Sequence, residues 1–217
     1  MNNNIKNSLI IITLVFLNYS LPGTAWCSDE KSNHTHVNSD QVDHSSHMAM
    51  MEKKLKRTVE NYIIPKVNLV NQDGVEQSLE KILNSEKTVV VDFIFTTCTT
   101  ICPVLSAGLV AFHKGLDDGA NNTVLVSISI DPEHDRPEVL KAYGEKFGMK
   151  PGHELLTGSR QDIYSVMNAF DAVMPNKMTH YPLTFFRAPG SKEWVRVFGM
   201  MSASDLMKEY RNVSKYL

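Results

Sequence analysis

The chain has 217 residues, of which 42% are hydrophobic and 21% charged, and its formal net charge at pH 7 is −2. This composition is near the globular average, which excludes a wholly disordered chain, a collagen-like repeat and a protein made mainly of membrane spans. The balanced charge supplies no basic excess for a nucleic-acid partner, and three cysteines are too few for a disulfide framework.

Residues 1–27 are typical of a targeting segment. Lys6 is the single charged side chain before an apolar run, 8–21, which ends at Pro22. A cationic start, a short apolar core and small residues predict a secretory signal peptide, since a membrane span needs about 20 apolar residues. Two alternatives stay open: the segment remains as an N-terminal membrane anchor, or Cys27 carries a lipid. All three predict an extracytoplasmic location, in the periplasm or at the outer face of the inner membrane.

Residues 28–57 predict a flexible polar tail, because they show no hydrophobic periodicity. The tail carries four of the eight histidines, His34, His36, His44 and His47, and three methionines follow them. Imidazole and thioether groups both bind copper. The tail is therefore either a loose copper-collecting segment or a solvated linker, and composition alone supports both interpretations.

Residues 58–217 alternate strand-like apolar runs with amphipathic helical patterns. In chain order, we expect a hairpin at 67–80, a buried strand at 88–95, a helix at 103–116, a buried strand at 123–130, a helix at 136–147, a helix capped by Ser159, a hairpin formed by 183–187 and 194–198, and a last helix capped by Ser202. This order predicts a thioredoxin-like α/β fold, with a central mixed sheet flanked by helices and an N-terminal hairpin.

Two cysteines, Cys98 and Cys102, stand where the first buried strand passes into the helix that starts at Pro103. Sites in α/β sheets form at the carboxyl ends of strands, and a helix N-terminus favours thiolates. Across one turn, the two sulfurs can close a disulfide or hold a soft ion such as Cu(I) or Zn. The alternative is a pair of buried, unreactive thiols or a permanent disulfide.

The segment Phe93–Pro103 (FIFTTCTTICP) resembles the central motif of the Sco/SenC family of copper-binding, thioredoxin-like proteins. The resemblance continues at Val126–Phe147, in a strand, an SIDP turn and a helix, and again at Leu155–Gly158. Together these segments span most of residues 67–217. The resemblance implies the fold already expected, and copper, as Cu(I) or Cu(II), as the cofactor.

The resemblance also implies a copper site made by Cys98, Cys102 and a histidine that precedes the second hairpin. His180 occupies that position, although the family's usual Asp-His-Ser context is Thr-His-Tyr here. The same two cysteines would form the redox pair if the protein is redox-active.

Four other polar residues are weaker candidates for the site. We expect His113 to cover the core, and His134 and His153 to be exposed in loops. Asp131 matches an aspartate of the family near the site. It either orients the cysteine turn, steers a partner, or simply caps its own turn.

The resemblance implies a metallochaperone that delivers copper to the binuclear copper site of cytochrome c oxidase. Its partners would then be the copper-bearing subunit of the oxidase and, as further candidates, another copper chaperone or a thioredoxin-like reductant. The alternative is an enzyme, a thiol–disulfide oxidoreductase that reduces cysteines of the oxidase subunit or of another extracytoplasmic target. Passive copper storage by the tail alone is a third hypothesis. Copper retention should need His180, whereas thiol exchange should need only the cysteines.

Overall fold

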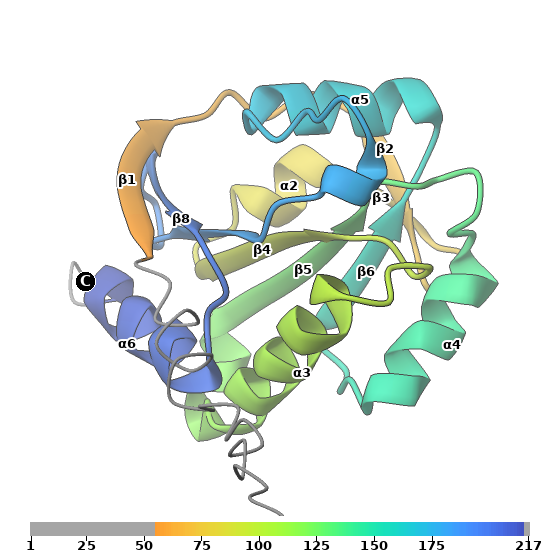
Figure 1. Ribbon diagram of the computed structural model, residues 1–217. Helices are drawn as coiled ribbons and strands as arrows, with labels where there is room; N and C mark the ends of the chain where they lie inside the picture. The colour runs from red at the N-terminus through yellow and green to blue at the C-terminus, as the bar shows by residue number, and fades with distance from the viewer. Residues whose placement is uncertain (1–54, 215–217) are drawn as a thin grey trace, which may run out of the picture. The chain divides into compact units, whose positions relative to one another are not determined.

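The structure, a computed structural model, describes residues 55–214 (Figure 1). The targeting segment and the tail histidines His34, His36, His44 and His47 lie outside the described residues. Between residues 55 and 214, no helix has the length and apolar character that crossing a membrane requires.

A mixed sheet runs through the described part of the chain, with the strand order β1-β8-β7-β4-β5-β6-β2-β3. At its centre β4 (Thr88–Ile94), β5 (Thr123–Ser129) and β6 (His153–Thr157) are parallel, whereas β7 and β2 pair antiparallel on either side. The other strands are β1 (Lys56–Asn61), β2 (Asn68–Asn71), β3 (Glu76–Ser78), β7 (Leu183–Arg187) and β8 (Glu193–Phe198). β4 is buried at every position, as its run of β-branched residues predicts.

Helices cover both faces of this sheet (Figure 1). On one face lie α2 (Leu79–Leu83) and α5 (Arg160–Ala169), and on the other lie α3 (Ile101–Lys114), α4 (Pro137–Phe147) and α6 (Ala203–Ser214). The first layer packs around Phe93 and Phe170, and the second around Phe112 and Leu206. The expected central mixed sheet flanked by helices is therefore present.

Local sequence signals account for the helix ends. Ser159 caps α5, because its side chain accepts a hydrogen bond from the Asp162 N–H at 3.1 Å. Gly148 ends α4 with a φ of 66°, a left-handed conformation that glycine adopts without a steric penalty. Both helices lie where the sequence predicts them.

The sequence does not predict strand β1. Its six residues are almost all exposed and pair antiparallel with β8, so the strand carries no apolar alternation that would reveal it. It includes Lys56 and Arg57, the end of the expected tail. The expected hairpin is present as β2 and β3, but β1 precedes it and α2 follows at once, because Ser78 caps that helix.

Candidate metal centre

The Cys turn, residues 95–102, connects the carboxyl end of β4 to the first turn of α3. The Cys98 N–H donates to the Phe95 carbonyl oxygen at 3.1 Å, which folds the chain back over the end of the strand. Thr100 immediately precedes α3, and its side chain makes no capping hydrogen bond to the helix. Backbone N–H groups at this helix end are therefore free to face a sulfur.

The Cys98 sulfur receives such hydrogen bonds. Burial acts to raise the pKa of this thiol, but hydrogen bonds from the backbone of Cys102 and from Thr100 outweigh it and lower the pKa to about 7. The Thr100 hydroxyl lies 3.6 Å from the sulfur. Cys98 is therefore close to half ionised at neutral pH, and its thiolate is the form that binds soft metals and attacks disulfides.

Cys102 is its electrostatic opposite. The side chain is fully buried, and burial raises the pKa of its thiol far above the usual range. A backbone hydrogen bond from Phe95 offsets this only in part, while the neighbouring Cys98 and Asp92 raise the pKa further. The two cysteines are both free thiols, one prone to ionise and one that keeps its proton.

His180 comes to the Cys turn through strand pairing. β7 runs antiparallel to β4, so the residues just before β7 lie beside the carboxyl end of β4. His180 Nδ1 lies 3.7 Å from Cys102 Sγ, in a buried position. Burial lowers the pKa of the imidazole to about 4, so the ring is neutral and able to act as a ligand at physiological pH.

The spacing of these two groups fits a shared ion. A metal about 2.3 Å from a sulfur and about 2.0 Å from a nitrogen, at a tetrahedral angle, places those atoms about 3.5 Å apart. His180 Nε2 is a buried atom without a hydrogen-bond partner among the described residues, whereas Nδ1 is the ring nitrogen that faces Cys102. Within residues 55–214, however, no three His, Cys, Asp or Glu side chains already enclose a metal position. The side chains of Cys98 and Cys102 are themselves close enough to share a hydrogen bond, and Cys102 contacts His180.

Of the other histidines, His113 is buried in α3 and His134 is exposed, as expected. The expectation for His153 is wrong, because it begins β6 and is buried. Its Nε2 lies 2.8 Å from the Ser127 hydroxyl, which donates to Asp92 at 2.5 Å. Sequence reasoning misses this row of buried hydrogen bonds. The one signal that could have found it is Asp92, the single acidic residue inside the apolar run of β4.

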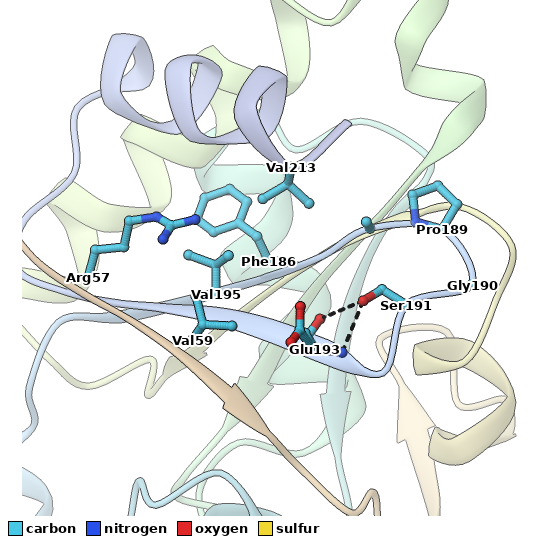
Figure 2. A pocket seen from close by; sticks show the side chains of 10 residues that line it. Arg57, Val59, Phe186, Pro189, Gly190, Ser191, Glu193, Val195 and Val213 are labelled. Atoms are coloured by element: carbon cyan, nitrogen blue, oxygen red, sulfur yellow. Dashed lines mark hydrogen bonds between the residues drawn. The ribbon is translucent and has the colours of Figure 1, made fainter. Parts of the chain in front are cut away.

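A pocket of about 390 Å³ lies elsewhere, between β1, the β7–β8 hairpin and α6 (Figure 2). Arg57, Phe186 and Val213 line it from these three elements, and Ser191 forms its rim beside Glu193. No cysteine or histidine contributes to its lining, so the pocket takes no part in the metal centre.

The model of the family described as SCO1/SenC matches residues 56–186, which include both cysteines and His180. The chain belongs to the SCO1/SenC family. The SCO1 protein homolog of Bacillus subtilis is 34% identical over 102 residues, 46% of this chain. The match spans about half the length of that relative, 52%.

Solved structures of this family share the fold. BsSco, described by its disulfide switch and as a member of the Sco family of cytochrome c oxidase assembly proteins, superposes with a TM-score of 0.61 and 26% identity, covering 73% of this chain and 96% of its own. ScoI of Arabidopsis thaliana with copper bound gives a TM-score of 0.61 and 25% identity, covering 71% and 99%. The thioredoxin-like fold is thus confirmed, and copper is the metal bound in structures of family members.

Proposed function

We propose that this SCO1/SenC family member binds copper through Cys98, Cys102 and His180 and delivers it to the binuclear copper site of cytochrome c oxidase. The observation that carries the proposal is the 3.7 Å contact between Cys102 Sγ and His180 Nδ1, next to a cysteine whose thiol ionises near neutral pH. Copper-bound relatives and an oxidase-assembly relative support the choice of metal and of destination.

The chemistry of the three groups suits copper. Two sulfurs and one imidazole form a soft donor set, which favours Cu(I) and also accommodates Cu(II). Cys98 and His180 are available as ligands near pH 7, whereas Cys102 must release its proton when the metal enters. Three protein ligands leave one coordination position of the copper open. A ligand from the receiving subunit can bind there before Cys98 and Cys102 dissociate from the ion.

A second function, thiol–disulfide exchange, is favoured by the difference in pKa between the cysteines. The Cys98 thiolate attacks a target disulfide, forming a mixed disulfide and releasing one target thiolate. Cys102 then loses its proton and attacks the Cys98 sulfur, which releases the second target thiolate. The target gains two electrons and this protein ends as the Cys98–Cys102 disulfide, so a thioredoxin-like reductant must restore it. That disulfide would also switch off copper binding.

The placement of this domain in the cell completes the proposal. We propose that residues 1–27 export the chain to the periplasm or hold it at the outer face of the inner membrane. The functional domain, expected at 58–217, includes β1 and so extends back to Lys56. The residues between, 28–55, serve as a linker, or as a copper-collecting tail through His34, His36, His44 and His47.

Copper titration of the purified protein tests the main proposal. We expect one ion per domain with thiolate-to-Cu(II) charge-transfer absorption, and loss of both in Cys98→Ser and His180→Ala. Lys141→Met is the control, because that lysine is exposed and pairs with Asp73, outside the site. A variant with the four tail histidines changed to alanine separates tail binding from domain binding. Full stoichiometry and unchanged absorption in Cys98→Ser would contradict the proposal.

A further inference from the structure

Residues 129–135, the end of β5 and the turn that leads to α4, hold the start of the Cys turn. Asp135 is fully buried there and accepts hydrogen bonds from the Thr96 N–H at 3.0 Å and from the Thr96 hydroxyl at 2.5 Å. The Ser129 hydroxyl also donates to Asp135, at 2.6 Å. Asp135 itself is fully buried and makes three short hydrogen bonds, so it fixes the start of the Cys turn firmly.

The same turn also reaches the segment that carries His180. Asp131 accepts a hydrogen bond from Lys177 Nζ at 2.5 Å, and Lys177 begins the short 3₁₀ helix η2 (Lys177–Thr179) that leads into His180. Lys177 Nζ also lies 6.0 Å from the centre of the Phe95 ring, which packs edge-on against the His180 ring. Lys177 thus lies between the β5–α4 turn, through Asp131, and the Cys turn, through Phe95, just before His180 in the chain.

The segment that carries His180 is internally ordered but weakly attached. The Asn176 side chain accepts from the Met178 N–H at 2.9 Å, and the His180 N–H donates to the Lys177 carbonyl oxygen at 3.1 Å. Residues 175–179 are all exposed, so packing contributes little to their position. Among the described residues, the Lys177–Asp131 pair is the ion pair that fastens this segment to the rest of the domain.

We propose that the Lys177–Asp131 pair is a latch that sets the position of His180 relative to the cysteines. Closed, it holds the imidazole against Cys102. Open, it frees η2 to carry His180 away, which leaves two sulfurs and lowers the retention of copper. Lys177 is a positioning residue in this inference, which rests on the proposed copper site.

The exposure of the pair suits a reversible device. The Lys177 side chain is 44% exposed and that of Asp131 is 11% exposed. A partly exposed ion pair is weak and is screened by salt, so modest forces open it. Because Asp135 is fully buried and the Lys177–Asp131 pair is partly exposed, the histidine can leave while the cysteines stay in place. A receiving subunit that disturbs Lys177 would thereby weaken the donor site at the moment of docking.

The test compares copper retention in Lys177→Met, Asp131→Asn and the charge-swapped double variant K177D/D131K. We expect Cu(I) affinity, measured by competition with a chelator, to fall about three- to ten-fold in each single variant and to recover in the double variant. Copper release to the chelator should accelerate by a similar factor. Raising NaCl from about 0.05 to 0.5 M should lower the Cu(I) affinity of the wild type to nearly that of Lys177→Met. The affinity of Lys177→Met itself should change little.

A matched control is Lys141→Met. It removes the exposed ion pair between Lys141 and Asp73, which includes no residue of the proposed site or latch. In the copper-free protein, amide hydrogen exchange of residues 176–180 should accelerate in Lys177→Met and stay unchanged in Lys141→Met. Unaltered exchange, affinity and release in Lys177→Met overturn the latch. Absence of cysteine-dependent copper binding in the wild type sinks the proposed function instead, while the exchange measurement still decides whether Lys177 holds the segment.

Discussion

Cys102 and His180 are 78 positions apart in the chain, yet the sulfur of one lies 3.7 Å from a ring nitrogen of the other. The contact exists because β4 and β7 are adjacent antiparallel strands, so that the residue entering β7 meets the residues leaving β4. The pairing of two strands this far apart in the chain cannot be seen in the local sequence. In the proposed copper site, this contact supplies two ligands from two different segments of the chain, and the predictions below separate their roles.

Replacing His180 with alanine should separate copper binding from thiol exchange. We expect Cu(I) affinity to fall at least about 100-fold, because losing even a hydrogen-bond partner of a metal ligand costs about 10–100-fold. The rate of disulfide reduction should change little, since the Cys98 hydrogen bonds do not involve the imidazole. Chelator competition and a disulfide-reduction assay on the same preparation measure both. Parallel losses of the two activities would show that the histidine supports the fold of the Cys turn.

Alkylation should distinguish the two cysteines. The pKa of Cys98 is about 7 and that of Cys102 is raised by burial, so iodoacetamide should modify Cys98 first, with a rate that rises through pH 7. Thr100→Val removes a hydroxyl that stabilises the thiolate and should raise the Cys98 pKa by about one unit. Thr97→Val, at an exposed position of the same turn, is the control. Equal rates for both cysteines at neutral pH would refute the asymmetry.

The buried Asp92 should make the copper-free protein less stable as pH rises. Burial raises its pKa from 3.8 to about 7, so the folded state binds this proton more tightly than the unfolded state. The stabilisation is complete below about pH 4 and is lost as pH climbs toward 7. Asp92→Asn removes this dependence, with a gain of at most about 4 kcal/mol in unfolding free energy at pH 8. Urea unfolding at pH 5 and pH 8 measures it.

Asp73→Asn is the control for that experiment, since Asp73 is exposed. A wild type and Asp92→Asn variant with parallel stability profiles across this range would mean that Asp92 is already ionised in the folded protein.

His153 should act in the opposite direction. Burial, with a smaller contribution from the neighbouring His113, lowers the pKa of its imidazole from 6.5 to about 3. The unfolded chain therefore takes up this proton first, and stability present above pH 6.5 is lost as pH falls toward 3. His153→Gln should flatten the acid side of the unfolding profile and leave the alkaline side as it is. An unchanged acid limb would assign acid unfolding to other groups.

The strand-to-helix position of Cys98 and Cys102 was accessible to sequence reasoning because its signals are local. A fully buried β-branched run precedes the cysteines, and a proline follows them at once. His180 was accessible only through the resemblance, since a lone histidine before a strand says nothing about which strand it joins.

Other parts of the site and fold depend on pairing that no local pattern records. β1 is recognised only by its hydrogen bonds to β8, because its side chains face solvent. His153 looked like a loop residue after Pro151 and Gly152, and only the pairing of β6 with β5 buries it. Nothing in the sequence around Lys177 distinguishes it from other surface lysines. Its proposed role comes from its contact with Asp131, which the resemblance places near the site.

The register of β1 determines at which end of the sheet this strand starts. Lys56 pairs with Phe198, and Phe198 pairs in turn with Leu183, three residues after His180. Strand β1 therefore starts at the same end of the sheet as His180, opposite the tip of the β7–β8 hairpin at Gly190. A substitution that loosens the first pairs of β1 would act on the end of the sheet where β7 begins, rather than on the hairpin tip.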